Sequence, residues 1–184
     1  MIAAVLDGAL GPAQWALVVA TAALAVGAAW TDIHWGKVFN LMTVPFAILG
    51  LTLNTVAGGI DGLLLSAGGI AAGFALWLLS RFLGRILGGG DIKLLMAFGA
   101  LLGPAFMFWT FVFGALIGGV IAVAMALRQG LLQSVLRGMC VSLYARAAMA
   151  TPMEITASAD ELRLPYAVAL CAGALLTIGI RLWT

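Results

Sequence analysis

Charged residues are scarce in this sequence. Only 9% of its 184 residues are Asp, Glu, Lys or Arg, whereas a soluble domain carries about 25%. Hydrophobic residues make up 64% of the chain, and the mean hydropathy is +1.17. The net charge of +2 comes without a basic tail, which argues against a nucleic-acid partner. The composition therefore predicts an integral membrane protein.

Metal-ligating residues are also few. The two cysteines, Cys140 and Cys171, lie far apart and form no CxxC pair, so the pattern indicates neither a zinc ribbon nor a disulfide framework. We interpret both as small apolar residues of helices. His34 is the only histidine and has no HExxH context, so it is interpreted as a surface residue and a zinc protease is not favoured. We expect no metal and no cofactor.

Apolar runs divide the chain into membrane spans of about 20 residues each. No Lys or Arg precedes the first run, which is unlike a secretory signal, so this run is expected to stay as a span. We expect six spans, at about 15–30, 40–56, 62–82, 92–102, 104–127 and 165–182. The fourth is short, and Gly103-Pro104 is alternatively a kink within one long bent helix. The prediction is a bundle of six transmembrane helices forming one membrane-embedded domain over residues 1–184.

Basic residues decide the orientation of these spans. With six spans, eight of the nine Lys and Arg residues collect on one side of the membrane, and only Arg181 lies on the other. The basic side is normally cytoplasmic, so both termini are expected outside. Merging the fourth and fifth spans would remove this asymmetry, which favours six.

The long polar interruption lies between the fifth and sixth spans, from Gln129 to Glu161. Leu132, Leu136 and Leu143 recur there at helical spacing, which predicts an amphipathic helix in the cytoplasmic interface. A plain connecting loop is the alternative.

Two of the seven acids lie where apolar spans meet the expected cytoplasmic face. Asp32 closes the first span, and Asp91 opens the fourth in the stretch LGGGDIKLL. Taken singly, Asp91 could be a helix N-cap and Asp32 a solvated loop acid near Lys37. At matching depth, however, the two carboxylates can meet across the bundle, and ionisable groups at membrane depth are often functional.

Such a pair has a definite chemistry. Two neighbouring carboxylates share a proton, so one can take a proton from water while the other protonates a peptide carbonyl. This is peptide hydrolysis without a metal or a covalent intermediate. The glycines before Asp91 would let an extended peptide approach the backbone closely. Lys93 either orients an acidic group of the substrate or extends toward the interface.

These motifs resemble those of the prepilin peptidases, membrane aspartic proteases that process type IV pilin-like precursors. GGGDIKLL resembles the GxGDxKL signature, TDIHWGKVFNLMTVP the first-aspartate segment, and LRLPYAVALCAGALL the closing helix led by Pro-Tyr. The usual Ile-Pro-Asn is here Val38-Phe39-Asn40. With six spans, the resemblance covers essentially the whole chain.

The resemblance implies Asp32 and Asp91 as catalytic residues, and Gly88, Gly90 and Lys93 as substrate-binding residues. The implied partners are the lipid bilayer and prepilins with a basic leader and a hydrophobic N-terminal helix, cleaved at the cytoplasmic face. The lack of CxxC pairs and of a further cytosolic part implies the short Tad/Flp-type form, which cleaves without methylating. Two alternatives are an archaeal-type preflagellin peptidase and a transporter or assembly component that uses the aspartates as a proton relay.

Overall fold

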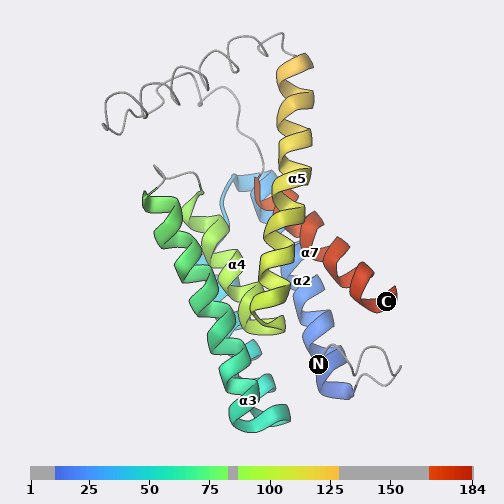
Figure 1. The fold of residues 1–184 in the computed structure, drawn as a ribbon. Helices are drawn as coiled ribbons and strands as arrows, with labels where there is room; N and C mark the ends of the chain where they lie inside the picture. The colour runs from blue at the N-terminus through green and yellow to red at the C-terminus, as the bar shows by residue number, and fades with distance from the viewer. Residues whose placement is uncertain (1–10, 83–86, 129–165, 184) are drawn as a thin grey trace. The chain divides into compact units, whose positions relative to one another are not determined.

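The computed structural model describes residues 11–82, 87–128 and 166–183, and every regular element in these ranges is a helix (Figure 1). The elements are α2 (Pro12–Trp35), α3 (Asn40–Phe82), α4 (Gly89–Leu102), α5 (Pro104–Arg128) and α7 (Tyr166–Trp183). Four of them, α2, α3, α5 and α7, are long and apolar enough to cross a membrane. The chain is therefore a helical, multi-pass membrane protein, but the expected count of six spanning helices is not confirmed.

The chain divides into two compact units, residues 1–117 together with 165–184, and residues 118–164. The first unit contains both candidate acids, and the following description concerns this unit. Of the second unit, the structure describes only the final turns of α5. The interfacial helix predicted within residues 129–161 lies outside the described residues.

Helix α2 is longer than the first predicted span. Pro12 occupies its first turn, where the missing N–H costs nothing, and Gln14 accepts a hydrogen bond from the Gly11 N–H at 3.1 Å. The helix ends at Gly36, which adopts the left-handed conformation (φ 61°) and donates its N–H to the Asp32 carbonyl at 2.8 Å. Asp32 thus lies within the last turn of the helix.

Helix α3 is a hairpin of two helical arms. Gly59 separates them with φ 59° and ψ −133°, a conformation open mainly to glycine. Asn54 on the first arm donates a hydrogen bond to Ser66 on the second at 2.9 Å, which a straight helix would not permit. The two arms coincide with the predicted second and third spans.

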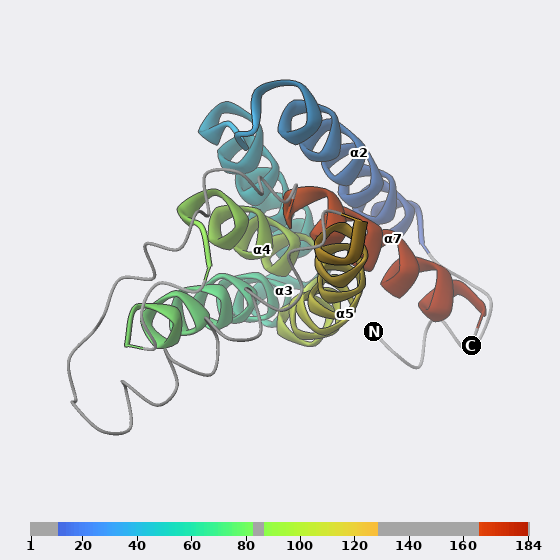
Figure 2. The same ribbon diagram turned by 90° about the horizontal axis from the view of Figure 1, so that it is seen from above.

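Helix α4 packs most extensively against the α3 hairpin. Small residues make this possible, because a Cβ at Gly69 would collide with the backbone of Gly99, and one at Gly50 would lie 2.6 Å from the Ala100 carbonyl. Seen from above, α4 lies between the two arms of α3 (Figure 2). It also packs against α2 and α7.

With 14 residues, α4 spans about 21 Å and is too short to cross a hydrocarbon core of about 30 Å. It ends at Gly103 (φ 86°), and Pro104 begins α5 as a separate helix, so one long bent helix is excluded. Because Pro104 has no N–H, the Ala100 carbonyl lacks its usual helical donor. Ser66 and Asn54 donate to this carbonyl instead, at 2.7 and 3.2 Å.

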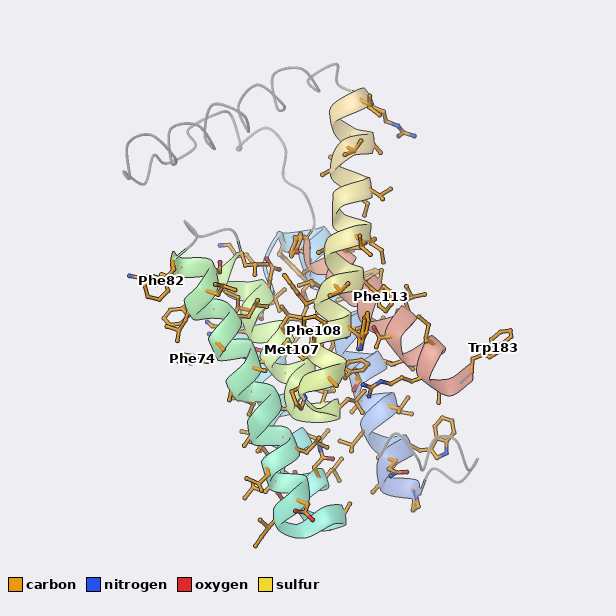
Figure 3. All side chains as sticks on the ribbon, in the orientation of Figure 1. Phe74, Phe82, Met107, Phe108, Phe113 and Trp183 are labelled. Carbon is orange, nitrogen blue, oxygen red and sulfur yellow. The ribbon has the colours of Figure 1, made fainter. Side chains whose placement is uncertain are left out.

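The core of the unit lies where α2, α4 and α7 meet. Its fully buried side chains include Leu24, Phe98 and Leu170. Large apolar side chains on the outside point away from the bundle, as Phe82 does at the end of α3 and Trp183 at the end of α7 (Figure 3). This inverted surface is what contact with lipid requires.

Candidate active site

The site forms where three helix ends meet. The C-terminal end of α2 and the N-terminal ends of α4 and α7 lie at the same end of the unit (Figure 1), and α2 packs against both other helices. Asp32 belongs to the first of these ends and Asp91 to the second. The fold therefore brings together the two acids that the sequence singled out.

Asp32 faces the beginning of α7. The backbone amides of Ala167 and Val168, in the first turn of that helix, approach its carboxyl group. A helix N-terminus carries partial positive charge and favours an anion nearby. The second carboxyl oxygen, Asp32 Oδ2, is buried and has no hydrogen-bond partner among the described residues. A buried acceptor without a partner is costly and is therefore a feature to explain by function.

Asp91 lies in the first turn of α4, but it is not the N-cap that the capping alternative assumed. Gly88 is the N-cap, and its carbonyl accepts the Ile92 N–H at 3.3 Å. Asp91 is the third helical residue, and its carboxyl group reaches back to the Gly88 backbone amide. This is the reciprocal half of a capping box, which holds the carboxyl group over the glycine turn.

The three glycines of this turn have different surroundings. A Cβ at Gly88 would lie 2.8 Å from Asp91 Oδ2, so a side chain there would displace the carboxyl group. A Cβ at Gly89 would have no neighbour within 4 Å. One at Gly90 would make ordinary contact with Val38, at 3.6 Å from its Cβ. Only Gly88 is thus required by the position of the acid itself.

The two acids interact electrostatically. The pKa of Asp91 is raised from its ordinary value of 3.8 to about 6. Burial is the largest cause and the negative charge of Asp32 the second, while the hydrogen bond from the Gly88 amide lowers the pKa. At pH 6 about half of the Asp91 carboxyl groups therefore carry a proton. Asp91 can act as an acid in the pH range where an isolated aspartate is fully ionised.

Lys93, predicted to bind substrate, is exposed and has a partner within the chain. Its Nζ donates a hydrogen bond to Asn40 Oδ1, at the first residue of α3, over 2.9 Å. Helix α3 begins at Asn40 although the usual preceding proline is absent, because the Phe39 carbonyl accepts the N–H groups of Met42 and Thr43.

Sequence reasoning missed two side chains of α7. The buried Cys171 interacts electrostatically with both Asp32 and Asp91, and Tyr166 interacts with Asp91. Cys171 was interpreted as an apolar residue without a role. The signal that could have found both was the Pro-Tyr-led closing helix, because Tyr166 begins it and Cys171 follows within two turns. His34, by contrast, stacks on Trp30 at the exposed side of α2, with 4.1 Å between the ring centroids.

The fold and the site together define a multi-pass helical membrane protein with a pair of interacting carboxyl groups. Residues 3–123 match the model of the type IV leader peptidase family, and the chain belongs to this family. The match includes Asp32, Asp91 and the glycine turn and ends before α7. No curated protein and no solved structure matches the chain. Membership makes the protein a membrane peptidase of the leader-peptidase type, with prepilin-type substrates.

Proposed function

We propose that the protein is an aspartic endopeptidase that removes the basic leader peptide from type IV prepilins, with Asp32 and Asp91 as its catalytic pair. The observation that carries this proposal is the different hydrogen bonding of the two acids. Asp91 is bonded to its own glycine turn and has a pKa of about 6. Asp32 Oδ2 is buried next to it in the bundle without a hydrogen-bond partner among the described residues.

On this basis we propose a role for each acid. In the fraction of molecules in which Asp91 is protonated, about half at pH 6, Asp91 donates its proton to the oxygen of the scissile carbonyl. Asp32 takes a proton from the attacking water, whose oxygen forms the new bond to the carbonyl carbon. The C–N bond of the tetrahedral intermediate then breaks, and Asp32 returns its proton to the leaving amine. Asp91 recovers the proton from the collapsing hydroxyl, so both acids end as they began.

The glycine turn is proposed as the place where the substrate backbone approaches. Gly88 is exposed and Gly90 is half-buried, so neither is covered by the rest of the bundle. We therefore assign Gly88 and Gly90 to substrate binding, since glycine permits close approach of an extended peptide. The hydrophobic helix of a prepilin lies in the same bilayer, and its leader would emerge at this end of the bundle.

The sidedness of the site is also a proposal. Lys37 follows α2, Arg81 lies in the last turn of α3 and Lys93 near the start of α4, at the helix ends of Asp32 and Asp91, whereas Arg181 lies in the last turn of α7. This distribution supports a cytoplasmic site with both termini outside. On this view residues 1–184 act as one peptidase domain in the cytoplasmic membrane. The Tad/Flp-type subclass, with cleavage but no methylation, remains a prediction from the sequence.

The test is co-expression of candidate prepilins with the wild-type protein, Asp32→Asn and Asp91→Asn, followed by electrophoresis of the pilin. Wild-type protein should convert the precursor to a shorter form, and both amide variants should leave it uncut. Asp61→Asn is the matched control, because Asp61 is an exposed acid just after the turn of the α3 hairpin. Its variant should cleave like the wild type.

Three other results would count against the proposal. Cleavage at the wild-type rate by either amide variant would exclude the paired mechanism. Cleavage of a preflagellin but of no prepilin would move the protein to the archaeal-type alternative. If the amide variants lose a proton flux across the membrane but show no defect in cleavage, the two aspartates are a proton relay and not a catalytic pair.

A further inference from the structure

Lys93 follows Asp91 by only two residues, yet its side chain is hydrogen-bonded to another helix. Residues two apart on a helix do not face each other, so the ammonium group of Lys93 is turned away from the Asp91 carboxyl group. It meets Asn40 Oδ1 at 2.9 Å, on a helix other than its own. Because the donor is charged, this hydrogen bond is stronger than one between neutral groups.

Asn40 is in turn connected to the other acid by a short piece of chain. Asp32 lies in the last turn of α2, the Gly36 N–H bonds to the Asp32 carbonyl, and α3 begins at Asn40. The Phe39 carbonyl accepts the N–H groups of Met42 and Thr43 in the first turn of α3, and the Asn40 side chain accepts the hydrogen bond from Lys93. The contact between Lys93 and Asn40 thus joins the helix of Asp91 to the start of α3, which a linker of four residues (36–39) connects to the last turn of α2.

The linker between α2 and α3 also passes close to the beginning of α4. Gly90 lies near Val38 in this linker, since a Cβ added at Gly90 would be 3.6 Å from Val38 Cβ, an ordinary van der Waals distance. The beginning of α4 therefore lies close to the linker at Gly90, before Asp91 in the sequence, and is hydrogen-bonded to the start of α3 through Lys93, after it.

We propose that Lys93 and Asn40 form a positioning pair that sets the spacing of Asp32 and Asp91. The inference rests on the proposed function, since a spacing matters only if both acids act together. Lys93 works through Asn40 and does not contact the substrate, which replaces the substrate-binding role predicted for it.

The test is a double-mutant cycle with Asn40→Leu, Lys93→Met and the double variant, each purified and assayed on a prepilin of known cleavage. Each single variant should lower kcat about tenfold, because small displacements of reacting groups cost one to two orders of magnitude, and KM should change less than about twofold. The double variant should be no worse than either single one, since both remove the same contact. Asn40→Asp and Lys93→Arg keep an acceptor and a donor and should restore most of kcat.

The matched control is Lys37→Met, which removes a positive charge from the same linker, at an exposed residue. It should leave both constants near those of the wild type. If Lys93→Met raises KM while Asn40→Leu changes neither kcat nor KM, Lys93 binds substrate and the proposal is overturned. Additive losses, or no loss in either single variant, would overturn it too. If the wild-type protein does not cleave the prepilin, the proposed function is wrong. If the wild type cleaves and the variants behave in one of the ways just described, only the positioning pair is wrong.

Discussion

At the C-terminal end of α4, buried side chains donate hydrogen bonds to the last carbonyl groups of the helix. At its N-terminal end, Asp91 interacts with a second acid, Asp32. Asn54 and Ser66 supply donors to the Ala100 carbonyl, which Pro104 leaves without a helical partner, and Asn54 also reaches the Leu101 carbonyl at 3.0 Å. At the other end, Asp32 Oδ2 is buried with no partner among the described residues. Both ends place polar atoms inside an apolar bundle.

The difference separates two uses of polarity in a membrane protein. A network in which donors match acceptors lowers the cost of ending a helix at membrane depth, so it serves stability. Two acids with an unmatched oxygen raise the free energy of the folded state and remain ready to exchange protons. Substitutions at the two ends should therefore affect different measurements.

The largest expected effect comes from the acids. Asp32→Asn and Asp91→Asn should each lower kcat by about 10²- to 10⁴-fold, because each removes a group that transfers a proton. The midpoint of thermal unfolding should stay the same or rise, since an amide carries no charge that burial or a second acid disfavours. Initial rates and thermal scans on the same purified samples check both parts. A large fall in the melting midpoint would mean that the acids hold the fold together.

A side chain in the glycine turn should produce the next largest effect. Gly88→Ala places a Cβ 2.8 Å from Asp91 Oδ2, so it should displace the carboxyl group and lower kcat about 100-fold. Gly89→Ala is the matched control, because it adds the same methyl group one residue later where nothing lies within 4 Å. Cleavage assays on the two variants decide the point. Equal losses in both would show that the turn needs flexibility and not space for the acid.

Sequence reasoning located the acids and most of the helices because both signals are local. Long apolar runs mark helices, and Asp32 and Asp91 stand out because so few charges interrupt these runs. The ends of α2 were predicted within five residues, and the two arms of α3 were predicted as separate spans, but the tight turn between these arms depends on the unusual conformation of Gly59. The shortness of α4 was visible in the sequence, yet six crossings were still counted.

The contacts between distant segments could not be predicted in the same way. Nothing near Lys93 in the sequence points to Asn40, and nothing near Asp32 points to the amides of α7. Asn54 and Ser66 carried a weak signal, as polar residues within apolar spans, but their shared acceptor follows only from the packing of α4 on α3. The position of Asp91 as third helical residue likewise required the helix start to be known.

The acidic end should also respond to pH. Cleavage should fall about tenfold for each pH unit above about 6, because the proposed acid form of Asp91 is lost as its carboxyl group ionises. The groups that face it are Asp32 on α2 and Tyr166 and Cys171 on α7. A pH–rate profile with Asp61→Asn as control tests this, and a flat profile between pH 6 and 8 would contradict the assignment of Asp91 as the acid.

The titration of Asp91 also predicts how the stability of the protein changes with pH. The pKa of Asp91 in the folded protein, about 6, exceeds its ordinary value of 3.8, so the folded protein binds more protons than the unfolded chain between these values. The contribution of Asp91 to stability is therefore complete below about pH 4 and is lost as the pH rises through 6. Thermal scans across this window should show a shallower decline for Asp91→Asn than for the wild type.

The smallest effect is expected at the closed end of α4, and it should leave the chemistry intact. Asn54→Leu removes the donor shared by the Ala100 and Leu101 carbonyls and should lower the free energy of unfolding by about 1–2 kcal/mol. Thr52→Val is the matched control, since its exposed hydroxyl bonds only to carbonyls of its own helix among the described residues. Unfolding in detergent measures the stability, and the cleavage rate per folded molecule should stay within about twofold for both variants. A rate loss in Asn54→Leu at unchanged stability would mean that the two ends of α4 are coupled, because a displaced C-terminal end would then have moved Asp91.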